Sequence, residues 1–196
     1  MPETEKASNA RQNIIDTTIR LISERGYAEV TTILIAQEAN VSQGLVFHYF
    51  KGKEALILAV TQQKLREFAE LLSKETSGEK NALKKIEKMA LGYCQMAGDM
   101  GVLFEVILRQ VKLFGLSRQQ MIKLGISELA DLLVETIQEG IEQGLIRKVN
   151  PNTVASCLFG ALNFNSLQWL ISEKSFSLRQ ATKEIVDVLV KGIQAT

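Results

Sequence analysis

Three side chains in this sequence carry chemistry often used for catalysis or metal binding: the single histidine, His48, and two cysteines, Cys94 and Cys157. The cysteines lie far apart and neither belongs to a CxxC pair, so a structural zinc site lacks the ligands it needs. No nucleophile–base pair, phosphate-binding loop or cofactor motif accompanies His48. The sequence therefore favours a binding protein over an enzyme, with no cofactor and with both thiols free in a reducing cytoplasm.

Recognition chemistry is concentrated in residues 41–56, which read VSQGLVFHYFKGKEAL. At about 100° per residue, Val46 and Phe50 share one helical face, which we expect to be buried. An amide can pair with an adenine edge, and an apolar group can contact the methyl group of thymine. The opposite face presents such groups together with an imidazole and a cation: Gln43, Gly44, Phe47, His48 and Lys51. This combination indicates a surface that reads DNA bases.

The charge pattern restricts any contact with a polyanion to this segment. The net charge of the chain is only +1, which gives no global attraction to nucleic acid. Residues 1–60 contain six Lys and Arg residues against seven Asp and Glu residues, yet no acid lies between Glu38 and Glu54. Lys51 and Lys53 lie in that interval, and Lys53 opens the next expected helix, where a lysine suits a phosphate.

A helical framework must position these residues. The chain has 196 residues, 46% of them hydrophobic, and only two prolines, Pro2 and Pro151. No apolar run of 18 residues and no signal peptide is evident, so no membrane contact is expected. Residues 1–8 are expected to form a tail, and residues 97–101 an interruption. Apolar spacing and capping residues predict helices near 9–25, 32–40, 43–50, 53–75, 80–97, 103–114, 117–143, 151–171 and 177–193.

The second and third of these helices are expected to form a helix-turn-helix, in which the second helix of the pair enters the major groove of DNA. Ile35, Ala36 and Ala39 give the supporting helix a small apolar face. Asn40 tolerates the left-handed backbone that such a turn requires, and Val41 can close the junction.

Residues 11–56 resemble the N-terminal domain of the TetR family of bacterial transcription regulators. Five residues depart from the family pattern. Asn40 replaces the usual turn glycine, Leu45 a common threonine and Phe47 a common tyrosine, and Ile33 and Leu34 fill positions that are often polar. Residues 57–196 match the family in length and helical character, and are loosely similar to its fatty-acid-responsive members. The resemblance is carried by Arg11, Ile14, Ile15, Leu21, GY at 26–27, TT at 31–32, IA at 35–36, A-NVS-G at 39–44, F-YF at 47–50 and KGKEAL at 51–56.

The resemblance implies an all-α fold, with a helix-turn-helix DNA-binding domain over residues 1–52 and a helical ligand-binding and dimerisation domain over residues 53–196. It implies a dimeric repressor that binds a palindromic double-stranded DNA operator and is released by a small, largely apolar effector, for which an acyl-type molecule is one option. A transcriptional activator, or a regulator without a small-molecule ligand, is the alternative.

The resemblance also assigns DNA contacts. Gln43, Leu45 and His48 would read bases, and Thr32 and Lys53 would contact phosphates. Two alternatives stay open from the residues themselves: Ser42 can act only as a helix cap, and Tyr49 can belong to the core. The residues expected at or near DNA are Thr32, Ser42, Gln43, Gly44, Leu45, Phe47, His48, Tyr49 and Lys53.

The C-terminal region offers candidate residues for an effector pocket and for a dimer interface. Methionine and aromatic side chains can line an adaptable apolar cavity, although such stripes are also typical of an ordinary core. The pocket candidates are Tyr93, Met96, Met100, Phe104, Leu108, Arg109, Phe114, Asn165 and Trp169. The last two helices can form a four-helix bundle with a second copy, although their apolar stripes also suit an intrachain core. The dimer candidates are Val154, Leu158, Ala161, Leu162, Ile185, Val188 and Leu189.

Overall fold

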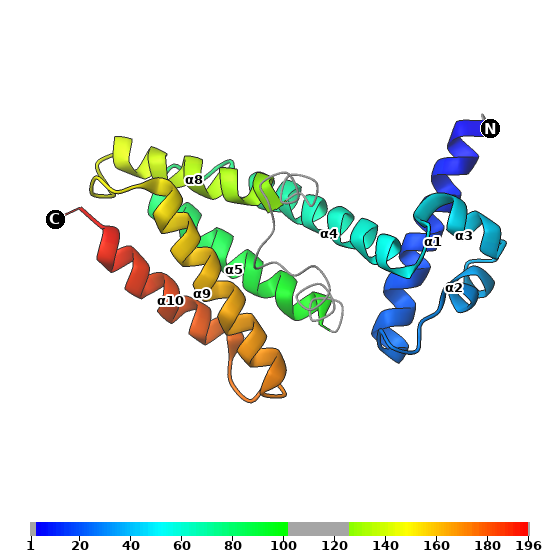
Figure 1. Cartoon of the computed structure of the whole chain (residues 1–196). Helices are drawn as coiled ribbons and strands as arrows, with labels where there is room; N and C mark the ends of the chain where they lie inside the picture. The colour runs from blue at the N-terminus through cyan, green and yellow to red at the C-terminus, as the bar shows by residue number, and fades with distance from the viewer. Residues whose placement is uncertain (1–2, 102–125, 196) are drawn as a thin grey trace. The chain divides into compact units, whose positions relative to one another are not determined.

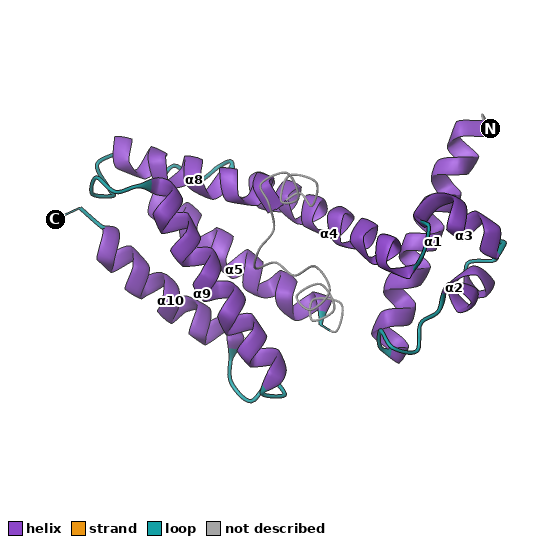
Figure 2. Ribbon diagram, viewed as in Figure 1, coloured by secondary structure: helices purple, strands orange, loops and turns teal. Residues whose placement is uncertain are grey.

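The computed structural model describes residues 3–101 and 126–195. Within these residues the secondary structure is helical, with no β-strand apart from one isolated bridge between Ile146 and Gln194 (Figures 1 and 2). This confirms the expected all-α class. The predicted helix near 103–114 and the first part of the one near 117–143 lie outside the described residues. The helices are α1 (Glu3–Arg25), α2 (Thr32–Glu38), α3 (Gln43–Phe50), α4 (Lys53–Thr76), α5 (Ala82–Met100), α8 (Ile126–Glu142), α9 (Pro151–Ile171) and α10 (Leu178–Ile193).

Two expected helix ends are wrong. Helix α1 begins at Glu3 instead of following a tail over residues 1–8, because glutamate, lysine and alanine have high helix propensity even without an apolar face. Helix α5 continues through residues 97–99 to Met100, because a single glycine inside a helix weakens it without ending it. The remaining described helices agree with the predicted ranges to within two residues at each end, except for the start of the predicted helix 117–143, which lies outside the described residues.

The chain divides into two compact units, and helix α4 begins in the first and ends in the second. The first unit packs α1, α2, α3 and the first half of α4. Its core is formed by aliphatic side chains that are almost completely buried: Ile14, Ile15, Leu21, Ile22, Ile35, Val46, Leu56 and Val60. Burial of Val46 and Phe50 confirms the face of α3 that the sequence assigned to the core. Burial of each such side chain stabilises the fold by about 1.5–3 kcal/mol, so this face fixes how α3 is presented.

The second unit contains the last part of α4 with α5, α8, α9 and α10. Helix α5 lies beside α8, α9 and α10, as Figure 1 shows. Helix α9 begins as predicted, with Pro151 at its first turn and the Asn150 side chain accepting hydrogen bonds from the backbone of Asn152 and Thr153. The core of this unit draws on every one of these helices, including Leu72, Ile86, Ala90, Leu133, Ile137, Leu158, Leu162 and Val186.

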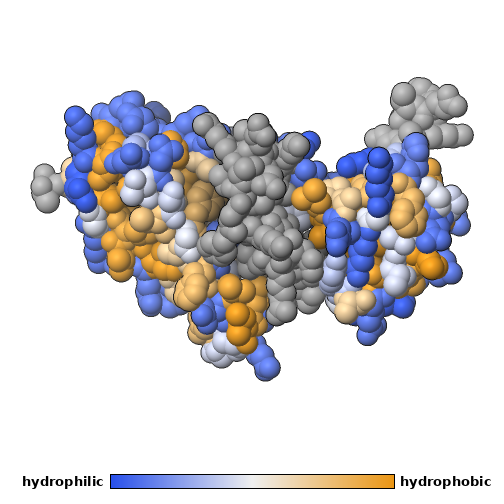
Figure 3. All heavy atoms as spheres, viewed as in Figure 1, coloured by the Kyte–Doolittle hydropathy of each residue, from blue (hydrophilic) through white to orange (hydrophobic). Residues whose placement is uncertain are grey.

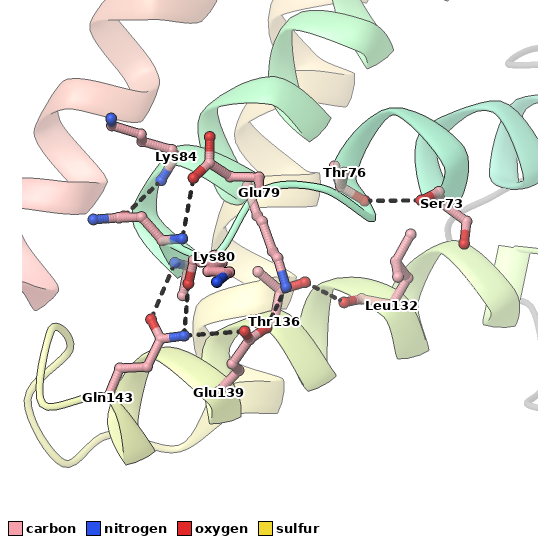
Figure 4. A network of polar contacts seen from close by, with 12 residues as sticks. Ser73, Thr76, Glu79, Lys80, Lys84, Leu132, Thr136, Glu139 and Gln143 are labelled. Carbon is pink, nitrogen blue, oxygen red and sulfur yellow. Dashed lines mark hydrogen bonds and ion pairs between the residues drawn. The ribbon is translucent and has the colours of Figure 1, made fainter.

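Polar contacts fasten the turn between α4 and α5 to the end of α8 (Figure 4). Lys85 and Glu139 form an ion pair at 2.6 Å, and the Gln143 side chain donates to the Lys80 carbonyl at 2.8 Å. Gln143 also accepts from the Ala82 backbone at 3.2 Å. A hydrogen bond from the Asn81 backbone, supported by the charge of Lys88, lowers the pKa of Glu79. This corner therefore holds α5 and α8 in a fixed register.

Helix α9 is unusually apolar for a helix of which only one side is covered. By length and composition alone α9 could cross a membrane, but core helices of soluble proteins meet the same two criteria. In α9, 22% of the most apolar 18-residue window is buried. Apolar side chains gather over α9 and α10 in the face shown in Figure 3. Phe164 is 61% exposed on α9 and Val188 is 70% exposed on α10. In the described part of the chain these apolar side chains are not covered.

Candidate functional site

The turn between α2 and α3 is built as the sequence predicts. Asn40 has a left-handed backbone with φ of 54°, and its amide donates to the Gln37 carbonyl at 3.1 Å. Ser42 caps α3 by accepting from the Leu45 backbone at 3.1 Å, and Thr31 caps α2 by accepting from the Leu34 backbone at 3.1 Å. Each cap contributes about 1 kcal/mol, so the angle between the two helices is fixed locally.

The outward face of α3 carries exposed side chains of the kinds that contact bases. Gln43, Gly44 and His48 are exposed, and Phe47 leaves 45% of its surface in water. An added Cβ at Gly44 would meet only the hydroxyl of Ser42, at 3.8 Å, so the backbone there is open to close approach. Leu45 is half-buried. An exposed phenylalanine beside an amide and an imidazole has no role in the core, which supports a surface used for binding.

Helix α1 holds the helix-turn-helix from behind through long-range contacts. The Asn13 amide donates to the Ala39 carbonyl at 2.7 Å, at the residue before the turn. Arg20 forms ion pairs with Glu38 at 2.7 Å and with Glu24 at 3.1 Å. The Arg20 guanidinium lowers the pKa of Glu38. One guanidinium offsets only part of the charge of these two acids, and the acid-free interval between Glu38 and Glu54 is what gives α3 its local positive character.

Lys53 is already engaged within the chain. Its ammonium donates to the Tyr27 carbonyl at 2.5 Å and lies 3.8 Å from the centroid of the Tyr27 ring. Burial lowers the pKa of Lys53, and burial together with the charge of Glu54 raises the pKa of Tyr27. Lys53 therefore ties the α1–α2 connection to the start of α4, a role that the sequence did not indicate.

The other predicted DNA contacts occupy different environments. Thr32 is half-buried at the start of α2. Tyr49 is half-buried, with its ring 5.3 Å from the His48 ring in an edge-on arrangement and 6.1 Å from that of Phe50. The Arg11 guanidinium lies 5.3 Å from the centroid of the Phe50 ring. Tyr49 thus connects the exposed face of α3 to its buried face.

The predicted effector residues separate into two places in the second unit. Tyr93 is buried and lines a narrow apolar cavity of about 20 Å³ together with Phe68, Leu72, Met89, Ala90, Leu129, Leu133, Leu158, Phe159 and Leu162. Its hydroxyl donates to the Asn163 side chain at 2.8 Å, and burial raises the pKa of Tyr93. Met96 and Met100 are half-buried on α5. Phe104, Leu108, Arg109 and Phe114 lie outside the described residues.

Trp169 does not reach that cavity. It lines an open pocket of about 320 Å³ between α5 and the α9–α10 connection. Asn165 is half-buried, and its side-chain nitrogen is enclosed without a hydrogen-bond partner. Leaving a buried donor unpaired costs about 1–3 kcal/mol, so Asn165 is a polar group that a partner or ligand would satisfy. Among the described residues, no cluster of His, Cys, Asp and Glu suits a metal ion.

The predicted dimer residues also divide. Leu158 and Leu162 are buried within the unit and line the apolar cavity, so they belong to the intrachain core. Val188 is exposed, and Val154, Ala161, Ile185 and Leu189 are half-buried. Exposed positions that the sequence analysis did not single out, Phe164 and Ile171, continue the outward face of α9.

Comparison with known proteins places this arrangement among regulators. A model described as bacterial regulatory proteins of the TetR family matches residues 14–60, and a model described as the C-terminal region of YsiA-like proteins matches residues 61–192. The fatty acid metabolism regulator protein of Bacillus subtilis is 24% identical over 184 residues, covering 92% of this chain and 93% of that protein.

Solved structures share the fold. The transcriptional regulator FadR from Bacillus subtilis, in complex with stearoyl-CoA, is similar with a TM-score of 0.76 and 23% identity, covering 93% of this chain and 98% of that one. FadR from Thermus thermophilus, a TetR-family repressor in complex with lauroyl-CoA, has a TM-score of 0.70 and 21% identity, covering 93% and 94%.

Proposed function

Since the chain belongs to the TetR family of bacterial regulatory proteins and is a DNA-binding transcriptional regulator, we propose that it is a dimeric repressor that acts in the cytoplasm. It binds a palindromic operator and leaves it when a long-chain acyl thioester binds the second unit. We further propose that the functional division of the chain lies near Gly52, with residues 1–52 contacting DNA and residues 53–196 serving effector binding and dimerisation.

The exposed face of α3 carries the DNA part of this proposal. Gln43 offers an amide to a base edge, Phe47 offers apolar surface to a thymine methyl, and His48 lies next to it. The Ser42 cap of α3 and the hydrogen bond from Asn13 to Ala39 already fix the exposed face of α3 in the free protein. Little conformational entropy is therefore lost when DNA binds.

The narrow apolar cavity supports an acyl effector. Its lining is almost entirely apolar, which suits a hydrocarbon chain, and two structural relatives were solved with stearoyl-CoA and lauroyl-CoA. A volume of about 20 Å³ has room for about one water molecule and not for a hydrocarbon chain. An acyl chain therefore enters only if the helices around the cavity separate.

That separation provides the signal. Phe68 and Leu72 of α4 form part of the cavity wall, and α4 begins in the DNA-binding unit. An acyl chain binds the open form better than the closed form, so it shifts the population toward a displaced α4. In a dimer, that displacement changes the separation of the two reading helices, which must match one turn of DNA, about 34–36 Å.

The outward faces of α9 and α10 supply the dimer contact in this proposal. Ala161, Phe164 and Ile171 on α9 and Ile185 and Val188 on α10 recur at spacings of three and seven residues, so they form one stripe on each helix. Two such helices from each chain can form a four-helix bundle. The apolar surface of α9 is then buried against the second copy.

The effector part can be tested by release of DNA. Protein bound to the DNA upstream of its own gene is titrated with stearoyl-CoA, and we expect release, while CoA alone leaves the complex intact. Leu158→Phe fills the cavity wall and should raise the stearoyl-CoA concentration needed, whereas Phe159→Leu should lower it. Release by CoA alone, or equal response of both variants, would contradict the proposed acyl site. A reporter gene under the operator, with and without the regulator gene, separates repression from activation.

A further inference from the structure

The open pocket beside Trp169 is separate from the acyl cavity. It lies between the second half of α5 and the connection from α9 to α10, and its lining shares no residue with that of the acyl cavity. Its volume of about 320 Å³ reaches the lower end of the range of small-molecule sites, about 300–1,000 Å³. At about 30 Å³ per water, it has room for roughly ten non-hydrogen atoms.

The walls of the pocket are apolar and aromatic. Trp169 and Phe176 contribute rings, and Leu91 and Leu178 contribute aliphatic surface. Aromatic rings favour offset or edge-on packing with another ring, by about 0.5–1.5 kcal/mol beyond the area buried. The body of a matching ligand is therefore a single aromatic ring.

The polar residues of the lining are Gln95, Ser177 and the cation Arg179. Arg179 lines the pocket, and its guanidinium forms no ion pair in the described part of the chain. The Lys174 ammonium lies 5.0 Å from the centroid of the Trp169 ring. Asp99 is the acid that contacts the pocket lining, and its carboxylate accepts from the Gln95 amide at 2.9 and 3.0 Å. A guanidinium without a partner binds a carboxylate through two parallel hydrogen bonds.

We propose that this pocket binds a small aromatic carboxylate, as a second ligand site of the protein. The ring packs against Trp169 and Phe176, and the carboxylate faces Arg179. A long acyl chain is too large for this space, and inorganic phosphate would leave the aromatic walls uncovered. The proposal does not depend on the acyl cavity or on the direction of transcriptional control.

The chain offers a direct reporter, because Trp169 is its only tryptophan. The full-length protein is titrated with phenylacetate, a ten-atom aromatic acid, while the emission of Trp169 and the heat of binding are followed. We expect saturable binding of one molecule per chain. Phenylacetamide, which lacks the charge, should bind about tenfold more weakly or worse, because hydrogen bonds between charged groups are stronger than neutral ones.

Matched variants locate the site. Arg179→Gln should weaken binding about tenfold, while Lys183→Gln should have no effect, because Lys183 is an exposed cation on the next turn of α10 and lines a neighbouring groove. Gly98 lines the pocket, and an added Cβ there meets nothing within 4 Å. Gly98→Ala should therefore retain binding, and Gly98→Phe should abolish it with the helical circular dichroism unchanged.

The outcomes that overturn the proposal are equally specific. An emission change that does not saturate, or equal affinity for phenylacetate and phenylacetamide, excludes a carboxylate site. Unchanged binding by both Arg179→Gln and Gly98→Phe places the ligand elsewhere. One-for-one displacement of phenylacetate by stearoyl-CoA would show that the two sites are a single site, whereas simultaneous binding of both supports two.

Discussion

The ammonium group of Lys53 has two candidate partners, a DNA phosphate and Tyr27. The family resemblance implies that it contacts a DNA phosphate, whereas its ammonium is held by the Tyr27 carbonyl and ring in the free chain. To reach a phosphate, the ammonium must leave the Tyr27 ring, which costs about 0.5–1 kcal/mol of cation–π attraction. A phosphate is a stronger partner than a ring, so we expect Lys53 to move when DNA binds.

The expected size of the effect follows from counterion release. Each phosphate contact contributes about −0.9 to the slope of the logarithm of the binding constant against the logarithm of the salt concentration. Lys53→Ala should therefore make the slope shallower by about 0.9 per chain. For a dimer on the operator the two changes add to about 1.8, so between about 50 and about 200 mM salt the affinity ratio of wild type to variant should fall roughly 12-fold.

Fluorescence anisotropy of a labelled operator at several salt concentrations measures this slope. Tyr27→Leu removes the ring but keeps both the backbone carbonyl and the charge of Lys53, so its slope should equal that of the wild type. Lys74→Ala, on the same helix but in the second unit, is the matched control and should also leave the slope unchanged. An unchanged slope for Lys53→Ala would refute the phosphate contact and leave Lys53 as a clamp on the Tyr27 connection.

Four further outcomes are expected. Gln43→Ala should reduce the preference for the operator over a base-substituted operator by about 1–3 kcal/mol while leaving the salt slope unchanged, measured by competition binding. Val188→Lys should convert the dimer to a monomer in analytical ultracentrifugation. Leu71→Lys, at a 51% exposed position outside α9 and α10, is the control and should leave the dimer intact. If Val188→Lys stays dimeric, the outward face of α9 and α10 is not the dimer interface. Gly140→Ala should lower the free energy of unfolding, measured in urea, by about 1–2 kcal/mol, because the new Cβ would lie 2.5 Å from Ile146 Cδ1 and 3.0 Å from Ala82 Cβ. Gly98→Ala is the control and should be neutral or stabilising, because its new Cβ would have no atom within 4 Å. Burial raises the pKa of Tyr93, so the folded state keeps the phenol protonated at a pH where the unfolded chain releases its proton. The contribution of Tyr93 to stability should therefore be complete below about pH 10 and decrease above it. In Tm measurements, Tyr93→Phe should make this decrease smaller.

The local architecture of the helix-turn-helix could be predicted because its signals are short-range. Ser42 and Thr31 each accept a hydrogen bond from a backbone amide three residues on, and Asn40 supplies the left-handed turn by its own conformational preference. The buried face of α3 follows from its periodicity, and Val46 and Phe50 confirm it. Each of these features depends on no more than five consecutive residues.

Contacts between distant residues were not predictable in this way. Asn13 meets Ala39 and Lys53 meets Tyr27 across 26 residues in each case, and no spacing rule connects such pairs. The same reason explains the effector and dimer residues. Leu158 and Trp169 both lie on an apolar helix, but only packing against α5, α8 and α10 decides which side chain lines the narrow cavity and which lines the open pocket.

Binding of the full-length protein to the DNA upstream of its own gene tests the central claim most directly. Mobility shift with increasing salt and with unrelated competitor DNA is the measurement. We predict a sequence-specific complex that weakens steeply with salt, contains two chains per operator and dissociates when stearoyl-CoA is added. Equal affinity for the upstream fragment, neighbouring promoters and unrelated DNA would contradict the assignment of the α3 face as a reader of an operator.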